Sequence, residues 1–186
     1  DTLYEGDFQD DQKIGICRLT SMLTGTQYIG DMYIYKKTGF GRFEDKDGYY
    51  IGGWKDDKKE GLGFRKEKDR IYFGFWRENQ REGIGYEFGP DYSYRGEFLS
   101  DKPHGRGIIK TANSTASRCV MFTMGNLLRV TQDDPDQFLK NMDQLDFQLF
   151  SKYIKDKIKK LELYIEREKE ELERRFSLLE FGVIVV

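Results

Sequence analysis

Large rings and glycines alternate along the first two thirds of the chain. In the segment 50–54, for example, Tyr50, Gly52 and Trp54 occupy every second position. Successive side chains of a β-strand point to opposite faces, so these three residues would share one face of a strand. The polar stretch from Lys55 to Glu60 is typical of a turn. The pattern therefore predicts a β-hairpin.

The same pattern occurs five times with a constant internal spacing. In each copy Tyr-x-Gly-x-(aromatic or Met) is followed, always at the same distance from the Tyr, by Gly-x-(Gly or Cys). The copies are Tyr4-Gly6-Phe8 with Gly15-Cys17, Tyr28-Gly30-Met32 with Gly39-Gly41, Tyr50-Gly52-Trp54 with Gly61-Gly63, Tyr72-Gly74-Trp76 with Gly83-Gly85, and Tyr94-Gly96-Phe98 with Gly105-Gly107. The step from one copy to the next is constant from Tyr28 onward and slightly longer between Tyr4 and Tyr28. A lone hairpin is marginal in water, so such a repeat predicts an array of hairpins that stack on one another.

A sixth, degenerate unit follows the five copies. One further step from Tyr94, as long as the step from Tyr4 to Tyr28, reaches Arg118. There Arg118, Val120 and Phe122 keep the alternation without the glycines. Terminal repeats are usually atypical because one of their faces meets no further repeat. We therefore predict a closing unit and an end of the sheet near Val130.

These residues resemble the MORN (membrane occupation and recognition nexus) repeat, whose hallmark is Tyr-x-Gly-x-Trp/Phe followed by Gly-x-Gly. The resemblance covers about residues 4–107. Met32 and Cys17 depart from it, so some distortion is expected in the first two units, with Cys17 as a small packing residue. The resemblance implies a mainly β fold, a single-layer antiparallel β-hairpin array. It also implies roles in ciliary, cytoskeletal or membrane-junction assemblies, or attachment to an enzyme, among which the fold alone does not choose.

The remainder of the chain reads as one long helix. Asp134 and Pro135 are typical of a helix start, with Gln137 at the capping-box position. No Gly or Pro occurs from Phe138 to Glu180, which predicts about 45 helical residues and a rod of roughly 65 Å. The chain thus divides into a β-array over 1–130 and a charged C-terminal α-helix with an apolar tail over 131–186.

The apolar seam of this helix is incomplete. In one heptad frame the a positions are Ile158, Ile165, Leu172 and Leu179, and the d positions are Phe147, Ile154 and Leu161. Glu168 and Arg175 then interrupt the d series. Either the first half packs on the array and the second half is solvated, or the helix forms a coiled coil with itself or a partner. The tail 181–186 is too apolar to stay exposed alone.

Composition and charge exclude several partners. Lys and Arg number 31 against 33 Asp and Glu, so no general field attracts nucleic acid or an anionic membrane. Rings interleaved with basic residues over 65–77 recur at repeat positions, which favours packing over base stacking. Cys17 and Cys119 form no CxxC pair, which is typical of a reducing compartment. No segment approaches the apolar length of a membrane-spanning helix, so a soluble, cytoplasmic protein is expected.

No motif for catalysis, for a cofactor or for a metal is found. His104 lies in a turn with no nucleophile beside it, so we interpret it as structural. Turn carboxylates such as Asp56 and Asp57 are explained by solvation and hydrogen bonding. The Gly-x-Gly elements precede no helix N-terminus and therefore do not form a phosphate loop. The sequence predicts a non-enzyme.

The leading hypothesis is a scaffold in an axonemal (ciliary or flagellar) or other cytoskeletal assembly, because a ribbon with a long helix can bridge two partners. A single layer would leave aromatic surface exposed, and we expect a helix or extended segment of another protein to cover it. The chain's own helix would instead leave the end of the array. The predicted partner-binding residues are Tyr50, Trp54, Tyr72, Trp76, Tyr94 and Phe98 on the array, and Ile158, Ile165 and Leu172 on the helix.

Two alternatives stay open. The first is a peripheral module that binds anionic phospholipids through basic turns, such as Lys36-Lys37 and Lys58-Lys59. Acidic residues among these lysines weaken the attraction, since each net cation contributes only about 1 kcal/mol at an anionic surface. The second is the targeting region of a larger enzyme.

Overall fold

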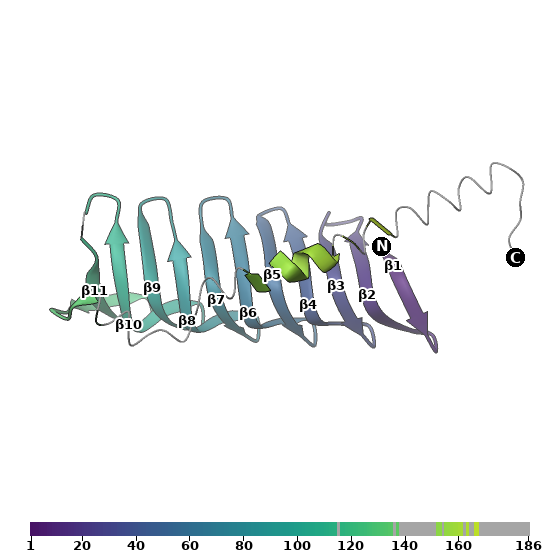
Figure 1. Ribbon diagram of the computed structural model, residues 1–186, viewed down its shortest axis with the longest axis horizontal. Helices are drawn as coiled ribbons and strands as arrows, with labels where there is room; N and C mark the ends of the chain where they lie inside the picture. Colours follow the sequence, from purple (N-terminus) through teal and green to yellow (C-terminus); the bar gives the residue numbers. More distant parts are fainter. Residues whose placement is uncertain are drawn as a thin grey trace, which may run out of the picture.

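One continuous antiparallel sheet makes up the array. The computed structural model describes residues 1–114, 116–135, 137, 152–153, 155–161, 163 and 166–167. Within these residues each of the twelve strands pairs with the next along the chain, as Figure 1 shows. The strands are β1 (Thr2–Gln9), β2 (Gln12–Ser21), β3 (Gln27–Tyr33), β4 (Lys36–Asp45), β5 (Gly48–Lys55), β6 (Lys58–Glu67), β7 (Ile71–Arg77), β8 (Gln80–Phe88), β9 (Tyr92–Leu99), β10 (Lys102–Thr111), β11 (Arg118–Thr123) and β12 (Asn126–Val130). The predicted hairpin array is confirmed.

Each unit is a hairpin with a two-residue turn. In the third unit the turn residues are Asp56 and Asp57, with φ values of 50° and 66°. Two consecutive positive φ values define a type I′ turn, whose twist matches that of the flanking strands. Asp and Asn tolerate this conformation better than most residues, which explains the acidic residues that the sequence places there.

Neighbouring turns are joined by a reciprocal pair of hydrogen bonds. The N–H of Lys37 donates to Oδ1 of Asp57 at 2.9 Å, and the N–H of Asp57 donates to the carbonyl of Lys37 at 3.1 Å. The same two bonds join Lys59 with Asn79 and Arg81 with Asp101. The Asp side chains therefore bond the preceding unit, and the repeats are held in register at their tips.

The closing unit consists of β11 and β12, and the sheet ends at Val130 as predicted. His104 contributes to its attachment, since its Nδ1 accepts a hydrogen bond from the N–H of Met124 at 3.3 Å. This is the structural role expected for His104.

The strand pairing of the first two units follows that of the other units, so the expected distortion is not seen in the pairing. Phe8 of the first unit is nevertheless 59% exposed, against 7% for the equivalent Trp54. Cys17 stands opposite Gly30 in regular pairing and is fully buried, which confirms its packing role. The pairing of β3 with β4 shifts in register between Gly30 and Met32. The third unit shows the same shift, between Gly52 and Trp54. The substitutions are absorbed because Cys is small and Met adapts its shape to its neighbours.

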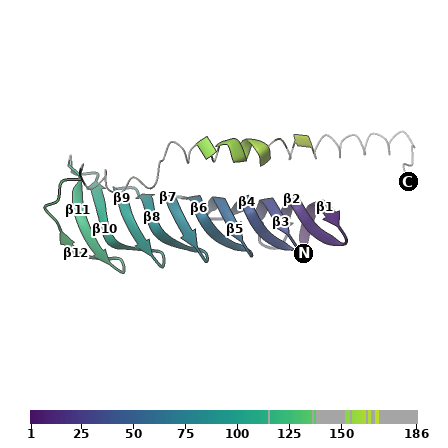
Figure 2. The same ribbon diagram turned by 60° about the horizontal axis from the view of Figure 1, so that its bottom comes forward.

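A helical segment, residues 155–161, lies over one face of the sheet (Figures 1 and 2). Its Leu161 is 7% exposed and packs with Phe40 of β4 and Ile51 of β5, next to the partly buried Ile158. The expectation that the helix leaves the end of the array is therefore wrong for this segment. The reason is that strand positions between the motif residues, such as Ile51, form a second apolar surface, which the sequence analysis did not use.

Much of the predicted helix, 138–180, lies outside the described residues, as do Ile165, Leu172 and the tail 181–186. Pro135 and Gln137 are helical, in agreement with the predicted helix start, and so are residues 152–153, 155–161, 163 and 166–167. The contacts of Ile158 and Leu161 agree with the alternative in which the first half of the helix packs on the array.

Leu161→Ala should release the helical segment from the sheet. Removing this buried side chain is expected to cost about 2 kcal/mol, so hydrogen exchange of residues 155–161 should quicken roughly 30-fold. Leu163→Ala is the matched control, because Leu163 is 53% exposed. Equal exchange in the two variants would show that Leu161 does not hold the segment.

Candidate interaction face

The six ring positions predicted as a binding site all lie on one face of the sheet, here called the motif face. They are Tyr50 and Trp54 on β5, Tyr72 and Trp76 on β7, and Tyr94 and Phe98 on β9. Tyr50 belongs to the ring cluster of this face, whereas Ile51 beside it packs with the helical segment. Since neighbouring residues of a strand point to opposite faces, the helical segment and the motif face lie on opposite sides of the sheet.

From Tyr28 onward, each motif tyrosine lies over a glycine of the next strand. Gly52 and Gly63 stand opposite each other on β5 and β6. A Cβ on Gly63 would lie 2.4 Å from Oη of Tyr50 and 2.5 Å from its Cε2, closer than any side chain permits. Tyr72 lies over Gly85 in the same way. The second glycine of each repeat thus makes the space that its tyrosine fills.

The rings of consecutive units form one continuous ladder of edge-to-face contacts. Tyr50 meets Trp54 of its own unit at 5.3 Å between ring centroids and Trp76 of the next unit at 5.2 Å. Tyr72 repeats this arrangement with Trp76 and Phe98, at 5.3 Å and 5.1 Å. Such contacts contribute about 0.5–1.5 kcal/mol each beyond the burial of area. Every unit is therefore coupled to the next through a shared tyrosine.

The tyrosine hydroxyls are satisfied within their own strands. The Tyr50 hydroxyl donates to the carbonyl of Gly53 at 3.0 Å, and the Tyr72 hydroxyl donates to that of Phe75 at 3.0 Å. Burial raises the pKa of both phenols above the ordinary value. These hydroxyls are neutral structural donors rather than acids or bases.

The two tryptophans differ in their hydrogen bonding. Nε1 of Trp54 donates to the carbonyl of Gly41 at 3.3 Å. Nε1 of Trp76 is buried and has no hydrogen-bond partner among the described residues.

The motif rings leave little aromatic surface exposed, which corrects the sequence-based expectation. The six rings have exposed fractions between 0% and 7%. They cover one another through the ladder, and basic side chains cover the remainder. The expectation of surplus rings that need a foreign cover is therefore wrong. A partner on this face would meet charged groups rather than bare rings.

A column of cations runs along the motif face. The side chain of Lys37 lies over the ring of Trp54, at 5.6 Å from its centroid. Lys59 lies over Trp76 at 4.8 Å, and Arg81 lies over Phe98 at 5.0 Å. These cations all stand at the same distance along the chain from the motif Tyr of their repeats, as does Lys13 from Tyr4. The regularity is visible in the sequence, but the sequence analysis passed over it.

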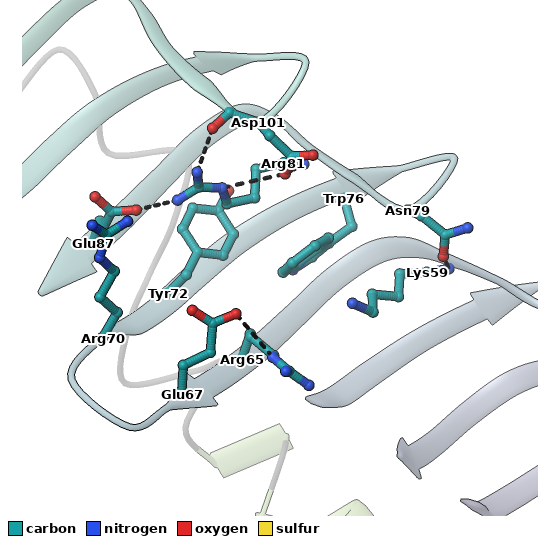
Figure 3. Close-up of a pocket in the computed structure, with 10 residues that line it drawn as sticks. All are labelled: Lys59, Arg65, Glu67, Arg70, Tyr72, Trp76, Asn79, Arg81, Glu87 and Asp101. Atoms are coloured by element: carbon teal, nitrogen blue, oxygen red, sulfur yellow. Dashed lines mark hydrogen bonds and ion pairs between the residues drawn. The ribbon is translucent and has the colours of Figure 1, made fainter. Parts of the chain in front are cut away.

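A cavity of about 260 Å³ lies at the centre of this face (Figure 3). It is lined by Lys59, Arg65, Glu67, Arg70, Tyr72, Trp76, Asn79, Arg81, Glu87 and Asp101. Arg65 pairs with both oxygens of Asp45 at 3.1 Å and 3.0 Å, and its Nε pairs with Glu67 at 3.3 Å. Burial alone would raise the pKa of Asp45, but the hydrogen bonds from Arg65 hold it below the usual value.

The other side of the cavity is also held by ion pairs. Arg81 pairs with Glu87 and with Asp101, and Figure 3 shows its guanidinium between them. Glu87 is buried and also accepts a hydrogen bond from the hydroxyl of Tyr92. Burial and this bond raise the pKa of Tyr92 to about 12. The walls of the cavity are therefore fixed before any partner arrives.

The fold and the ring ladder define a repeat protein in which every hairpin contacts only its neighbours. The family model of the MORN repeat matches residues 50–66, 72–93 and 94–115. The segment 50–115 thus carries MORN repeats. The units that start at Tyr4 and Tyr28 lie outside the matched segments and yet continue the same sheet. No curated protein matches the chain. Within the described residues no helix is long and apolar enough to span a membrane.

The predicted site residues thus fall into three groups. The six array rings come together on the motif face, as building elements of its core. Ile158 lies on the opposite side, against the sheet. Ile165 and Leu172 lie outside the described residues. The structure adds charged residues of the motif face, such as Arg81 and Glu87, to which the sequence-based prediction gave no role.

Trp54→Ala and Trp76→Ala should each destabilise the array by about 3 kcal/mol or more, because each removes a buried ring that links two units. Denaturant unfolding measures the change. Tyr33→Ala serves as the control, since Tyr33 is 62% exposed and should contribute less than about 0.5 kcal/mol. Losses below about 1 kcal/mol for both tryptophans would refute the ladder as the source of stability.

Proposed function

We propose that the chain is a non-enzymatic scaffold that binds partner proteins through its motif face in an axonemal or other cytoskeletal assembly. MORN repeats are known in protein-binding and membrane-binding roles. The observation that carries the proposal is the position of the helical segment. It covers the opposite side of the sheet, and no described helical residue takes part in the ring cluster of the motif face.

The motif face suits the recognition of a segment that lies across the strands. Its surface is preformed, because the ring ladder and the turn-to-turn hydrogen bonds fix every unit relative to the next. From β5 to β9 the strands span four spacings, or about 19 Å. A partner helix of about 13 residues covers that length. Cations over the rings and carboxylates beside them would select the partner by its charges.

The elongated shape supports a bridging role. Twelve strands at the usual spacing give a ribbon of about 53 Å. One face of this ribbon holds the chain's own helical segment (Figure 2). The other face carries the charged cavity. A long, two-sided element can hold two components of an assembly apart at a set distance, which is the task of a cytoskeletal scaffold.

A comparison of matched variants tests the motif face. Lys37→Ala with Arg81→Ala removes two cations of this face, whereas Lys36→Ala with Lys58→Ala removes the same charge from exposed turn positions. Tagged chains are purified from ciliated cells and co-purifying proteins are quantified. We expect the first variant to lose its main partner at least fivefold and the second to keep it.

Equal capture by the two variants would contradict binding through the motif face, provided that both melt like the wild type. The same cells test the location. We expect the tagged chain to remain with the detergent-insoluble cytoskeleton. Release into the detergent-soluble fraction would contradict the cytoskeletal assignment.

The lipid alternative receives less support from the turn lysines. Lys36 pairs with Asp56 at 3.3 Å, and Lys58 pairs with Glu78. These ion pairs leave the turns with little net charge for an anionic surface to attract.

We therefore expect weak binding to vesicles of phosphatidylserine and phosphatidylcholine, lost at physiological salt because surface charges are screened within about 8 Å. Vesicle sedimentation at low and at physiological ionic strength measures it. Tight binding that resists salt and depends on the headgroup would favour the membrane role instead.

A further inference from the structure

From Lys37 to Arg81 the cation column of the motif face contains one irregular position. Each of its cations stands beside a turn residue of the next unit. The Lys37 ammonium pairs with Asp57 at 3.6 Å. Arg81 pairs in the same way with Asp101, at 3.3 Å. At the equivalent position beside Lys59 the residue is Asn79, which carries no charge.

Asn79, which stands where the neighbouring units have Asp, keeps the same backbone conformation and the same backbone hydrogen bond. Oδ1 of Asn79 accepts the N–H of Lys59 at 2.8 Å, as the Asp residues do in the neighbouring units. The φ value of Asn79 is 71°, against 66° for Asp57 and 67° for Asp101. Because Oδ1 of Asn79 accepts the backbone N–H of Lys59, the NH₂ group of Asn79 takes no part in this bond. A hydrogen-bond donor thus replaces the second oxygen of a carboxylate.

Lys59 therefore lacks the counter-ion that Lys37 and Arg81 have. No carboxylate among the described residues forms an ion pair with it, and its side chain is half-buried over the rings of Tyr50 and Trp76. Burial and the nearby Arg65 lower the pKa of Lys59, against the weaker opposing influence of Asp45, Asp101 and Glu67. A half-buried ammonium without a partner is costly, and a bound anion would relieve that cost.

The cavity of about 260 Å³ opens beside Lys59 and Asn79 (Figure 3). It is many times larger than the roughly 30 Å³ that one water occupies, so the end of a side chain can enter. Its lining holds four basic residues and three carboxylates. Arg65 and Arg81 are already paired with acids, whereas Lys59 is not.

We propose that this cavity binds one carboxylate of an acidic side chain of the partner protein, held by the Lys59 ammonium. The inference rests on the proposed function and adds the chemistry of its anchor point. A single negative charge matches the one half-buried cation of the described lining that forms no ion pair. A phosphoryl group carries about two charges and would meet Glu67, Glu87 and Asp101 in the same lining, so it fits less well.

The test uses the full chain labelled with ¹³C at the lysine Cε, and the NMR signal of Lys59 is followed. The probes are N-acetyl-glutamate α-amide, its neutral glutamine counterpart and inorganic phosphate. Asn79→Asp supplies the missing carboxylate from within the chain, at a turn position where Asp57 and Asp101 show that Asp is accommodated. Asp57→Asn is the matched control, since it makes the opposite change one unit away.

We expect the glutamate probe to shift the Lys59 signal in a saturable manner and the glutamine probe to leave it unchanged. Asn79→Asp should weaken the binding at least tenfold and raise the pKa of Lys59. Asp57→Asn should leave the affinity within twofold. An unresponsive Lys59, an equal affinity in Asn79→Asp, or tighter binding of phosphate than of glutamate would each overturn the proposal.

The outcome is independent of the partner's identity, because the probe is a free amino-acid derivative. A failed titration with intact partner capture would reject the anchor alone. A successful titration without any partner capture would reject the scaffold function and leave the carboxylate site in place.

Discussion

The close approach of a tyrosine ring to a backbone without Cβ atoms is the constraint on which the array depends. A Cβ on Gly63 would lie 2.4 Å from the hydroxyl oxygen of Tyr50, so only glycine leaves room for the ring. Glycines of consecutive strands consequently face one another across the sheet. The flattened rings meet those of the next unit edge to face. A single layer of strands thereby gains a core that sheets usually form against a second layer.

This core determines what each face can offer a partner. The motif rings are buried against one another. Their face therefore presents the cations that lie over the rings, such as Lys59, and the carboxylates next to these cations. The opposite side also carries ring contacts, of Tyr49 with Phe64 and of Phe73 with Tyr86. There Phe40 and Ile51 remain available to Leu161 of the helical segment. One face therefore presents charged groups, and the other packs against the helical segment by apolar contact.

The sequence predicted the hairpins well because their signal is repeated. The spacing from Tyr50 to Gly61 recurs unchanged in every unit, and a physical requirement at each ring enforces it. The side of the sheet that the helical segment occupies could not be predicted in this way. It depends on residues such as Ile51, which lie between the motif positions and carry no repeat signature of their own. The sequence predicted that Trp76 packs in the array, but not that the motif rings would be almost fully buried, because each ring also meets one of the neighbouring unit.

At two turns the residues depart from the repeat, yet the hydrogen bonds between neighbouring units are kept. In the second turn Ile34 adopts a φ of 45°, which costs a β-branched residue about 1–2 kcal/mol. Tyr35 stands there in place of an Asx residue, and its hydroxyl bonds the carbonyl of Asp11, so the link between units is kept by other atoms. Asn79 likewise keeps the link to the preceding turn while it removes a charge from beside Lys59. In both places the bond between units is retained and the exposed chemistry changes. Because each unit contacts only its neighbours, such a change alters one point of the surface and leaves the remaining units as they were.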